Sequence, residues 1–362
     1  MNIETKNVLS IYRDYLSYER GTPLRVKSLL NEISKDKKIK LYTASRDTCV
    51  KFGVGHLRLS TNNISNLIEL NRFIKENNIK IVIFHTISAG YYMIPLWMLN
   101  RRFKKILEMH GFSEEEGKLY GDQSFYKYHR NKFFYSCIYR LSDLITTCSQ
   151  TASEKLLYFN KNTYTVLGGV DLIKFDVNLK KHNKPKLNGE GLTIGYAGNG
   201  RIWQGLPFLI DAFSALTKID PSFNLKLLLS EKLSLPNITN VSVLEPVKHS
   251  AVAGFSASCD ILVIPRPDNV VNTLSFPSKL MEYLAMGIPV VASKTSDVHR
   301  IIVHGESGML FNPGDTQGFI ECVMALKDNK LRDSIGVSGC EIARKYSWEI
   351  QSKLFTDLVK SM

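Results

Sequence analysis

The sequence predicts an α/β protein with two doubly wound domains. At 362 residues the chain is too long for one ordinary hydrophobic core. Short apolar runs typical of strands alternate with longer segments whose apolar residues recur at helical spacing. The polar segment 180–191 interrupts this alternation, which then resumes. Strand–helix repetition on both sides of a linker is typical of two parallel-sheet domains, and ligands of such sheets bind at the carboxyl ends of the strands, here in a shared cleft.

The apolar runs place the strands in both halves of the chain. In the first half the expected strands lie at 7–12, 38–44, 79–85, 104–110, 143–149 and 163–168, with helices such as 23–34 and 64–77 between them. In the second half they lie at 192–198, 223–230, 241–245, 259–265, 288–293 and 308–311. The predicted domains are residues 1–178 and 192–345, joined by a linker at 179–191.

The composition is that of a soluble globular protein. Hydrophobic residues make up 44% of the chain and charged residues 22%. The N-terminus MNIETKNVLSIYR has no apolar core of a signal peptide, so we expect no secretory signal. The most apolar stretch, 81–99, contains His85, Gly90 and Pro95, which favours strand, loop and helix over a spanning helix. The six cysteines are scattered, which indicates reduced cytosolic thiols rather than disulfides or a zinc site.

The net charge of +13 is concentrated in the first half of the chain. Residues 1–180 carry 28 Lys and Arg against 17 Asp and Glu, whereas residues 181–362 carry 19 against 17. Two segments, 100–105 and 126–140, mix cations with aromatic residues. Such a mixture is typical of a solvated helix face or of a surface that binds an anionic bilayer. A surface that binds nucleic acid would have a similar composition.

A carboxylate interrupts the apolar segment PSKLMEYLAMGIPVVAS at 277–293. Glu282 does not complete a capping box with Ser278, because the answering position is Met281. An i,i+3 pair with Lys279 would leave that cation in the first helical turn, where the helix dipole disfavours it. An anion bound near Lys279 would remove this objection, and Glu282 could then accept hydrogen bonds from ribose hydroxyls. The structural and the functional interpretation stay open at this point.

A glycine-rich segment, GYAGNGRIWQG at 195–205, follows a predicted strand and precedes a predicted helix. Gly195, Gly198 and Gly200 form G-x-x-G-x-G rather than the dinucleotide-binding G-x-G-x-x-G, and Glu231 comes too late for the usual ribose partner. A dehydrogenase is therefore disfavoured. The missing side chains instead allow a diphosphate to approach backbone N–H groups.

Both segments resemble signatures of the retaining glycosyltransferases of family 4, which have the GT-B fold. The segments VLGGVDLIKF at 166–175, DLITTCSQ at 143–150 and LEMHGF at 107–112 are similar to further elements of that family in the same order. HGESGMLFNPGD at 304–315 and KYSWEIQSKLF at 345–355 are similar to its last ones. The resemblance runs from Gly21 to the C-terminus. It implies two Rossmann-like domains facing a cleft, an acceptor-binding first domain, a nucleotide-sugar-binding second domain, and a final helix, 346–362, that packs back on the first.

The resemblance also implies site residues. His110 would contact the donor sugar, and Arg201 and Lys279 would hold the diphosphate; these three are the expected catalytic residues. The expected donor-binding residues are Gly21, Gly198, Asn199, Gly200, Gln204, Asn272, Thr273, Leu274, Ser275, Ser278 and Glu282. The chain departs from the family pattern in two places. Asn199 and Gln204 stand where an Arg and a Lys are usual, and Leu274 replaces the first acid of Glu-x7-Glu.

The function implied is transfer of a sugar from a UDP- or GDP-linked donor to a glycan or lipid-linked acceptor, in cell-surface polysaccharide or glycoconjugate biosynthesis. No metal or other cofactor and no nucleic acid is expected, and the protein would be cytoplasmic, at the inner face of the membrane. One alternative is a nucleotide-sugar epimerase of the same architecture, which needs cleft carboxylates that this chain lacks. Another is a non-enzymatic membrane or nucleic-acid adaptor, which leaves Glu282 without a purpose.

Overall fold

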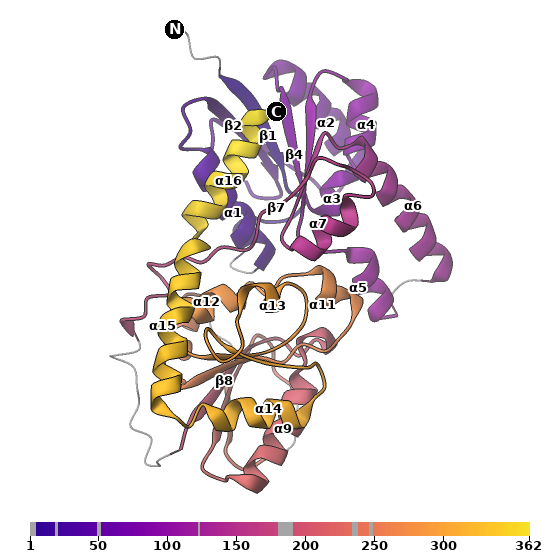
Figure 1. Ribbon diagram of the computed structural model, residues 1–362. Coiled ribbons are helices and arrows are strands. Elements are labelled where there is room, and N and C mark those ends of the chain that lie inside the picture. Colours follow the sequence, from indigo (N-terminus) through magenta and orange to yellow (C-terminus); the bar gives the residue numbers. More distant parts are fainter. Residues whose placement is uncertain are drawn as a thin grey trace. The chain divides into compact units, whose positions relative to one another are not determined.

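The computed structural model describes residues 5–18, 21–48, 52–121, 124–179, 191–233, 238–245 and 249–362 (Figure 1). The chain forms two compact units. The first unit comprises the residues up to Leu167 together with Trp348–Met362, and the second comprises Gly168–Ser347.

The first unit is built on a parallel sheet. Its described residues form seven strands in the order β3-β2-β1-β4-β5-β6-β7. The central strands are buried along almost their whole length, which is why their sequences are nearly continuous apolar runs. The bounds are β1 Lys6–Ile11, β2 Ile39–Ser45, β3 Gly55–Arg58, β4 Ile81–His85, β5 Lys104–Met109, β6 Leu144–Thr147 and β7 Thr163–Thr165.

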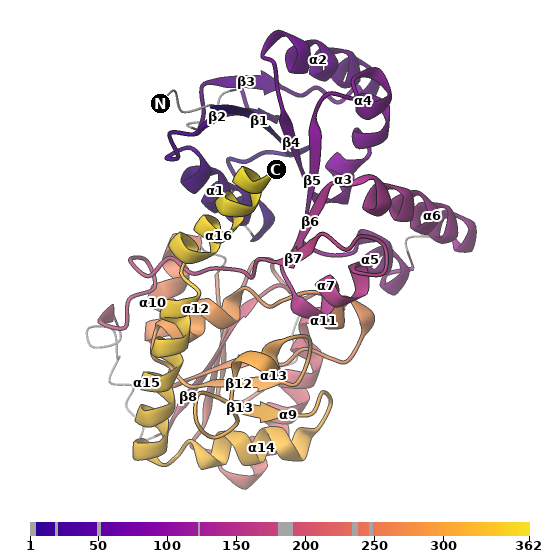
Figure 2. The same ribbon diagram turned by 45° about the horizontal axis from the view of Figure 1, so that its top comes forward.

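Helices connect these strands and flank the sheet (Figure 2). Side-chain caps mark several of their starts: Asn62, Ser124 and Ser149 each accept backbone N–H groups of the first turn. The bounds are α1 Gly21–Ile33, α2 Asn63–Glu76, α3 Thr86–Gly90, α4 Met93–Leu99, α5 Ser113–Leu119, α6 Phe125–Leu141 and α7 Gln150–Leu156. Over the described residues, every helix is too short or too polar to cross a bilayer.

The last helix returns to the first unit. Helix α16, Trp348–Ser361, lies beside α1 in both views (Figures 1 and 2). Phe355 and Val359 are fully buried in the apolar core of this unit. Polar contacts join the same surfaces, because the Ser352 hydroxyl donates to the Ser28 carbonyl at 3.1 Å and Lys360 pairs with Asp36 at 3.0 Å.

The second unit repeats the architecture with a second parallel sheet. Its described residues form six strands in the order β10-β9-β8-β11-β12-β13. The strands are β8 Thr193–Gly198, β9 Asn224–Leu229, β10 Val241–Leu244, β11 Ile261–Ile264, β12 Val290–Ser293 and β13 Met309–Phe311. Their flanking elements are η1 Ile202–Gln204, α9 Leu206–Ile219, η2 His249–Ala251, α10 Val252–Ala257, α11 Val270–Leu274, α12 Lys279–Ala285, α13 Val298–Ile301, α14 Thr316–Ala325 and α15 Asn329–Lys345.

The sequence placed twelve of these strands and missed β3. This edge strand, GHLR, is four residues long, half exposed, and lacks the apolar run by which the others were found. The predicted end of the first domain at 178 is wrong, because residues 168–178 belong to the second unit. Val170 forms a backbone bridge with Ser347, and Phe175 is buried near His249. Most of the predicted linker, 180–190, lies outside the described residues.

Candidate functional site

The glycine-rich loop of the second unit follows β8, an interior strand of its sheet. Two glycines in it allow close approach of other groups. A Cβ on Gly198 would lie 2.7 Å from the Lys279 Nζ and 2.6 Å from the Tyr196 hydroxyl. Gly205, which precedes α9, has φ +77°, and a Cβ there would lie 1.7 Å from the Pro265 carbonyl oxygen. The absent side chains thus bring the loop against Pro265, the residue after β11, and against the Lys279 amine.

Lys279 opens α12 and points toward this loop. Its Nζ donates a hydrogen bond to the Gln204 Oε1 at 3.1 Å and lies 5.2 Å from the centre of the Tyr196 ring. Burial lowers the pKa of Lys279 to about 7, the nearby Arg266 cation adds to this, and Glu282 opposes it. The surroundings of this amine therefore disfavour positive charge, and a bound anion would relieve that cost.

Arg266 is a second cation at this place, and sequence reasoning missed it. It is buried directly after β11, where its Nη1 donates to the Ser275 hydroxyl at 3.3 Å and its guanidinium lies 5.2 Å from the centre of the Trp203 ring. The signal was present in CDILVIPRPD, because a cation that follows a buried strand lies at the edge where parallel sheets bind ligands.

Arg201 and Asn199 belong to the loop itself. The Arg201 side chain is exposed, while its backbone N–H donates to the Asn199 Oδ1 at 3.2 Å. The Asn199 carbonyl in turn accepts the Tyr196 hydroxyl at 3.0 Å, and the Gly200 N–H donates to Glu231 at 3.1 Å. The structure thus places Lys279 and Gln204 in direct contact at the loop, with Arg201 on its exposed side.

Glu282 lies one turn along α12 from Lys279, and its ion-pair partner is His249. The Glu282 Oε1 lies 3.0 Å from the His249 Nε2, and the Glu282 side chain is 14% exposed. His249 was not expected as a site residue, because nothing in the sequence near 249 marks it out. Ser278 is exposed and makes no side-chain cap to α12, so the capping-box reading fails here as its spacing suggested.

The segment 269–275 lies next to the loop through Asn272. The Asn272 side chain is buried, and its Nδ2 donates to the carbonyls of Trp203 at 2.9 Å and Pro267 at 2.8 Å. Its Oδ1 is buried with no hydrogen-bond partner among the described residues. The Thr273 hydroxyl donates to the Asn269 carbonyl, and the Leu274 side chain is buried. These side chains hold the segment in place.

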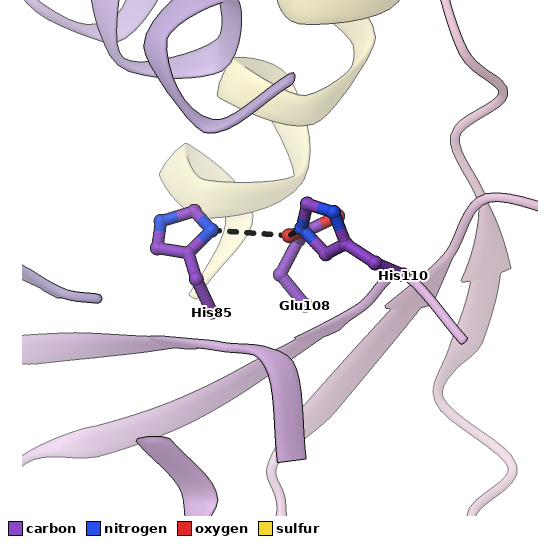
Figure 3. A group of neighbouring side chains, drawn as sticks. All are labelled: His85, Glu108 and His110. Atoms are coloured by element: carbon purple, nitrogen blue, oxygen red, sulfur yellow. Dashed lines mark hydrogen bonds and ion pairs between the residues drawn. The ribbon is translucent and has the colours of Figure 1, made fainter. Parts of the chain in front are cut away.

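In the first unit, His110 belongs to a buried charge network at the carboxyl ends of β4 and β5 (Figure 3). Glu108 is fully buried and contacts the His110 Nε2, the His85 Nδ1 at 3.0 Å and the Arg25 Nε at 2.8 Å. Burial alone would raise the pKa of Glu108, but His110 and Arg25 hold it well below its usual range. Burial lowers the pKa of His110, against the attraction of Glu108.

Sequence reasoning found His110 and missed Glu108 and Arg25. The signal in LEMHG was alternation: Glu108 and His110 are two residues apart at a strand end and therefore lie on the same face of the sheet. Arg25 also donates to the carbonyls of Val166 and Leu167, the last residues before the second unit. Gly21 is the first residue of α1, and residues 19 and 20, directly before it, lie outside the described ones.

The same three side chains are close enough to be considered for a metal ion. One ligand atom from each of His85, Glu108 and His110 lies within 4.8 Å of the others. A cation there would compete with Arg25 for the carboxylate and would break the direct contacts between the carboxylate and both imidazoles. We therefore expect a hydrogen-bonded network that orients His110 rather than a metal centre.

Two family models match the sequence. The model described as "Glycosyl transferases group 1" matches residues 191–329, and that described as "Glycosyltransferase Family 4" matches residues 43–174. An uncharacterized glycosyltransferase of Methanocaldococcus jannaschii is 28% identical over 155 residues, which are 40% of this chain and 41% of that protein. The capsular polysaccharide biosynthesis glycosyltransferase CapM of Staphylococcus aureus is 24% identical over 261 residues, 63% of this chain and 67% of CapM.

A solved structure shares the whole fold. HepE of Anabaena in complex with UDP-glucose superposes with a TM-score of 0.75 over 98% of this chain and 100% of HepE, at 14% identity. The two matched segments lie one in each half of the chain, and both models describe glycosyltransferases. The chain therefore belongs to glycosyltransferase family 4 and has the GT-B fold.

Proposed function

We propose that the protein is a retaining glycosyltransferase that moves a sugar from a UDP- or GDP-linked donor to a glycan or lipid-linked acceptor. The observation that carries the proposal is the arrangement on α12. Lys279, with Arg266 nearby, provides positive charge beside the glycine-rich loop, and Glu282 follows one turn later. This is the chemistry that a nucleoside diphosphate requires, with cations for the phosphates and a carboxylate for the ribose hydroxyls.

The reaction places the largest electrostatic demand on the leaving group. As the bond between the anomeric carbon and the phosphate oxygen breaks, negative charge grows on the diphosphate, and Lys279, Arg266 and Arg201 would stabilise it. The acceptor hydroxyl forms its new bond on the same face of the sugar and passes its proton to the departing phosphate oxygen. His110, oriented through its Nε2 by Glu108, would accept a hydrogen bond from a sugar hydroxyl at its other nitrogen.

The proposed role is assembly of cell-surface polysaccharide or glycoconjugate. CapM, with 24% identity, is named for capsular polysaccharide biosynthesis, and HepE was crystallised with UDP-glucose. The first finding supports a glycan product, and the second supports a nucleotide-sugar donor. Neither family model describes an epimerase, so that alternative is not favoured.

The direct test is a screen of donors with and without acceptor. Purified protein is incubated with UDP-glucose, UDP-galactose, UDP-N-acetylglucosamine and GDP-mannose, and nucleotide release and sugar products are measured. The proposal expects acceptor-dependent release of UDP or GDP and, by NMR, a product with the anomeric configuration of the donor. Conversion of the donor to an epimer without acceptor, or an inverted product, would contradict it. We propose that the reaction requires no metal, so a chelator should leave the rate unchanged.

We propose further that helix α6 attaches the protein to the inner face of an anionic membrane. Its exposed aromatic residues Phe125, Tyr126 and Phe133 are 81%, 76% and 73% exposed. Exposed cations lie among them on the same helix, at Lys127, Arg130 and Lys132. Aromatic rings at the lipid interface and cations at anionic headgroups are the pattern of a peripheral helix.

Vesicle sedimentation tests the attachment. Binding to vesicles with anionic lipid should exceed binding to neutral vesicles, fall with added salt, and weaken in the variant Lys127→Glu/Arg130→Glu. The matched control is Lys218→Glu/Lys330→Glu, an equal charge change at two exposed lysines of the second unit. Equal loss in both variants would show that net charge alone, rather than the α6 surface, draws the protein to the membrane.

A further inference from the structure

Three side chains of the second unit form a chain of contacts that ends on Glu282. Lys174 lies in the segment after Gly168, and its Nζ is 2.6 Å from the His249 Nδ1. The other ring nitrogen of His249, Nε2, is 3.0 Å from the Glu282 Oε1. The Phe175 ring packs against the imidazole, with 5.9 Å between ring centres at an angle of 67°. The His249 side chain is 21% exposed.

The donors and acceptors in this chain have one consistent order. A lysine ammonium only donates, so the His249 Nδ1 must accept from Lys174. The ring proton is then on Nε2, which donates to the Glu282 carboxylate. Lys174 therefore selects the tautomer of His249, and His249 in turn fixes which oxygen of Glu282 is engaged.

We propose that Lys174 and His249 are positioning residues that hold Glu282 for recognition of the ribose of the donor nucleotide. With Oε1 held by His249, the Oε2 of Glu282 is the oxygen presented to a ribose hydroxyl. Phe175 limits rotation of the imidazole, so the carboxylate keeps one orientation before the nucleotide binds. This inference rests on the proposed function, because it requires a nucleotide at Glu282.

The contacts also distinguish this role from simple packing. A residue that only filled space would not need both ring nitrogens engaged at 2.6 and 3.0 Å by groups of opposite charge. Preorganisation of this kind raises affinity for the group that the carboxylate binds, and it leaves the contacts of the rest of the nucleotide unchanged. Loss of the contacts that link Lys174, His249 and Glu282 should therefore reduce the preference for a ribonucleotide over the same nucleotide without its 2′- and 3′-hydroxyls.

The test compares binding of UDP with 2′,3′-dideoxy-UDP, and of GDP with its dideoxy analogue, by calorimetry. The wild-type protein should prefer the ribonucleotide by about tenfold or more, the scale of a hydrogen bond to a charged group. His249→Leu should reduce this preference to about twofold and leave dideoxy binding nearly unchanged. His249→Gln, whose amide can accept from Lys174 and donate to Glu282, should keep most of it, and Lys174→Met should give an intermediate value.

Controls separate the outcomes. His299→Leu, at an exposed histidine of the same unit, should bind like the wild type. Two results would contradict the positioning role of Lys174 and His249 but leave the proposed nucleotide site intact. One is a ribonucleotide preference in His249→Leu and Lys174→Met equal to that of the wild type. The other is an equal loss of affinity for the ribonucleotide and its dideoxy analogue. If the wild-type protein binds neither UDP nor GDP, the proposed function is contradicted, and so is the positioning role of Lys174 and His249.

Discussion

At the scale of single residues, the proposed chemistry of the second unit centres on Lys279. Its amine is surrounded by Gln204, the Tyr196 ring and the space left by Gly198, with the Arg266 charge close enough to lower its pKa. A lysine in such surroundings contributes little to the stability of the fold, because burial penalises its charge. A bound diphosphate would give this arrangement a purpose.

Replacing Lys279 should therefore damage catalysis more than folding. We expect Lys279→Met to lower turnover with nucleotide sugar by roughly 10²–10³, the scale for removing a group that stabilises transition-state charge. The matched control is Lys218→Met, at an exposed lysine on α9, which should keep wild-type turnover. Wild-type turnover in Lys279→Met would refute its assignment to the leaving group.

Binding of the diphosphate should also change the protonation of Lys279. With a pKa of about 7, this amine is mostly neutral at pH 8 in the free protein. A bound anion favours the charged form and raises the pKa, so nucleotide binding at pH 8 should take up protons, up to one per site. Calorimetry in buffers of different ionisation enthalpy measures this uptake. It should vanish in Lys279→Met and at pH 5.5, where the amine is already protonated; identical proton uptake in wild type and variant would contradict the prediction.

Residue types in a local pattern were predictable, and long-range partners were not. Lys279 and Glu282 could be found because each conflicts with its own helix, the lysine with the dipole and the acid with apolar neighbours. His249 lies 33 positions from Glu282 in the chain, and Arg25 lies 83 from Glu108, so no local spacing reveals either contact. Arg201 was expected from its place in the loop, and its role remains a prediction.

At the scale of elements, the strand–loop–helix formed by β8, η1 and α9 depends on its glycines. Gly205 turns the chain into α9 in a left-handed conformation and passes directly against the Pro265 carbonyl. The parallel strands of both sheets could be predicted because burial on two faces leaves continuous apolar runs. The loop conformation could not, because it depends on contacts with β11 and α12 that are distant in sequence.

A substitution at Gly205 should make the second unit less stable. Gly205→Ala combines a left-handed φ with overlap on a backbone carbonyl, so we expect a loss of about 2–3 kcal/mol in the free energy of unfolding, measured by urea titration. The control is Gly254→Ala within α10, where a Cβ would meet nothing within 4 Å. That variant should be neutral or slightly more stable. Equal stability of the two variants would contradict this account of the loop.

At the scale of the whole molecule, the chain passes twice between two units of the same architecture. It leaves the first unit after Leu167 and returns at Trp348. The resemblance that the sequence shows to family 4 predicted this architecture, whereas the position of the first crossing was misjudged. The packing of the segment 168–178 on the second unit through Val170 and Phe175 is visible only in three dimensions.

The return of α16 should be essential for the stability of the first unit. Phe355 lies far from the rest of that unit in sequence but is fully buried in its core. Phe355→Ala should therefore lower the free energy of unfolding by about 3–5 kcal/mol. The neighbouring Leu354 is 44% exposed, and Leu354→Ala should change stability by about 0.5 kcal/mol or less. A small effect of both substitutions would show that α16 is not part of the core.

The measurement that tests the central claim most directly is a crystal structure of the protein with UDP or GDP. The account predicts ribose hydroxyls within about 3.2 Å of Glu282 and the diphosphate between Lys279 and the loop at 198–204. A nucleotide bound elsewhere, or bound with Glu282 turned away from its ribose, would contradict the account.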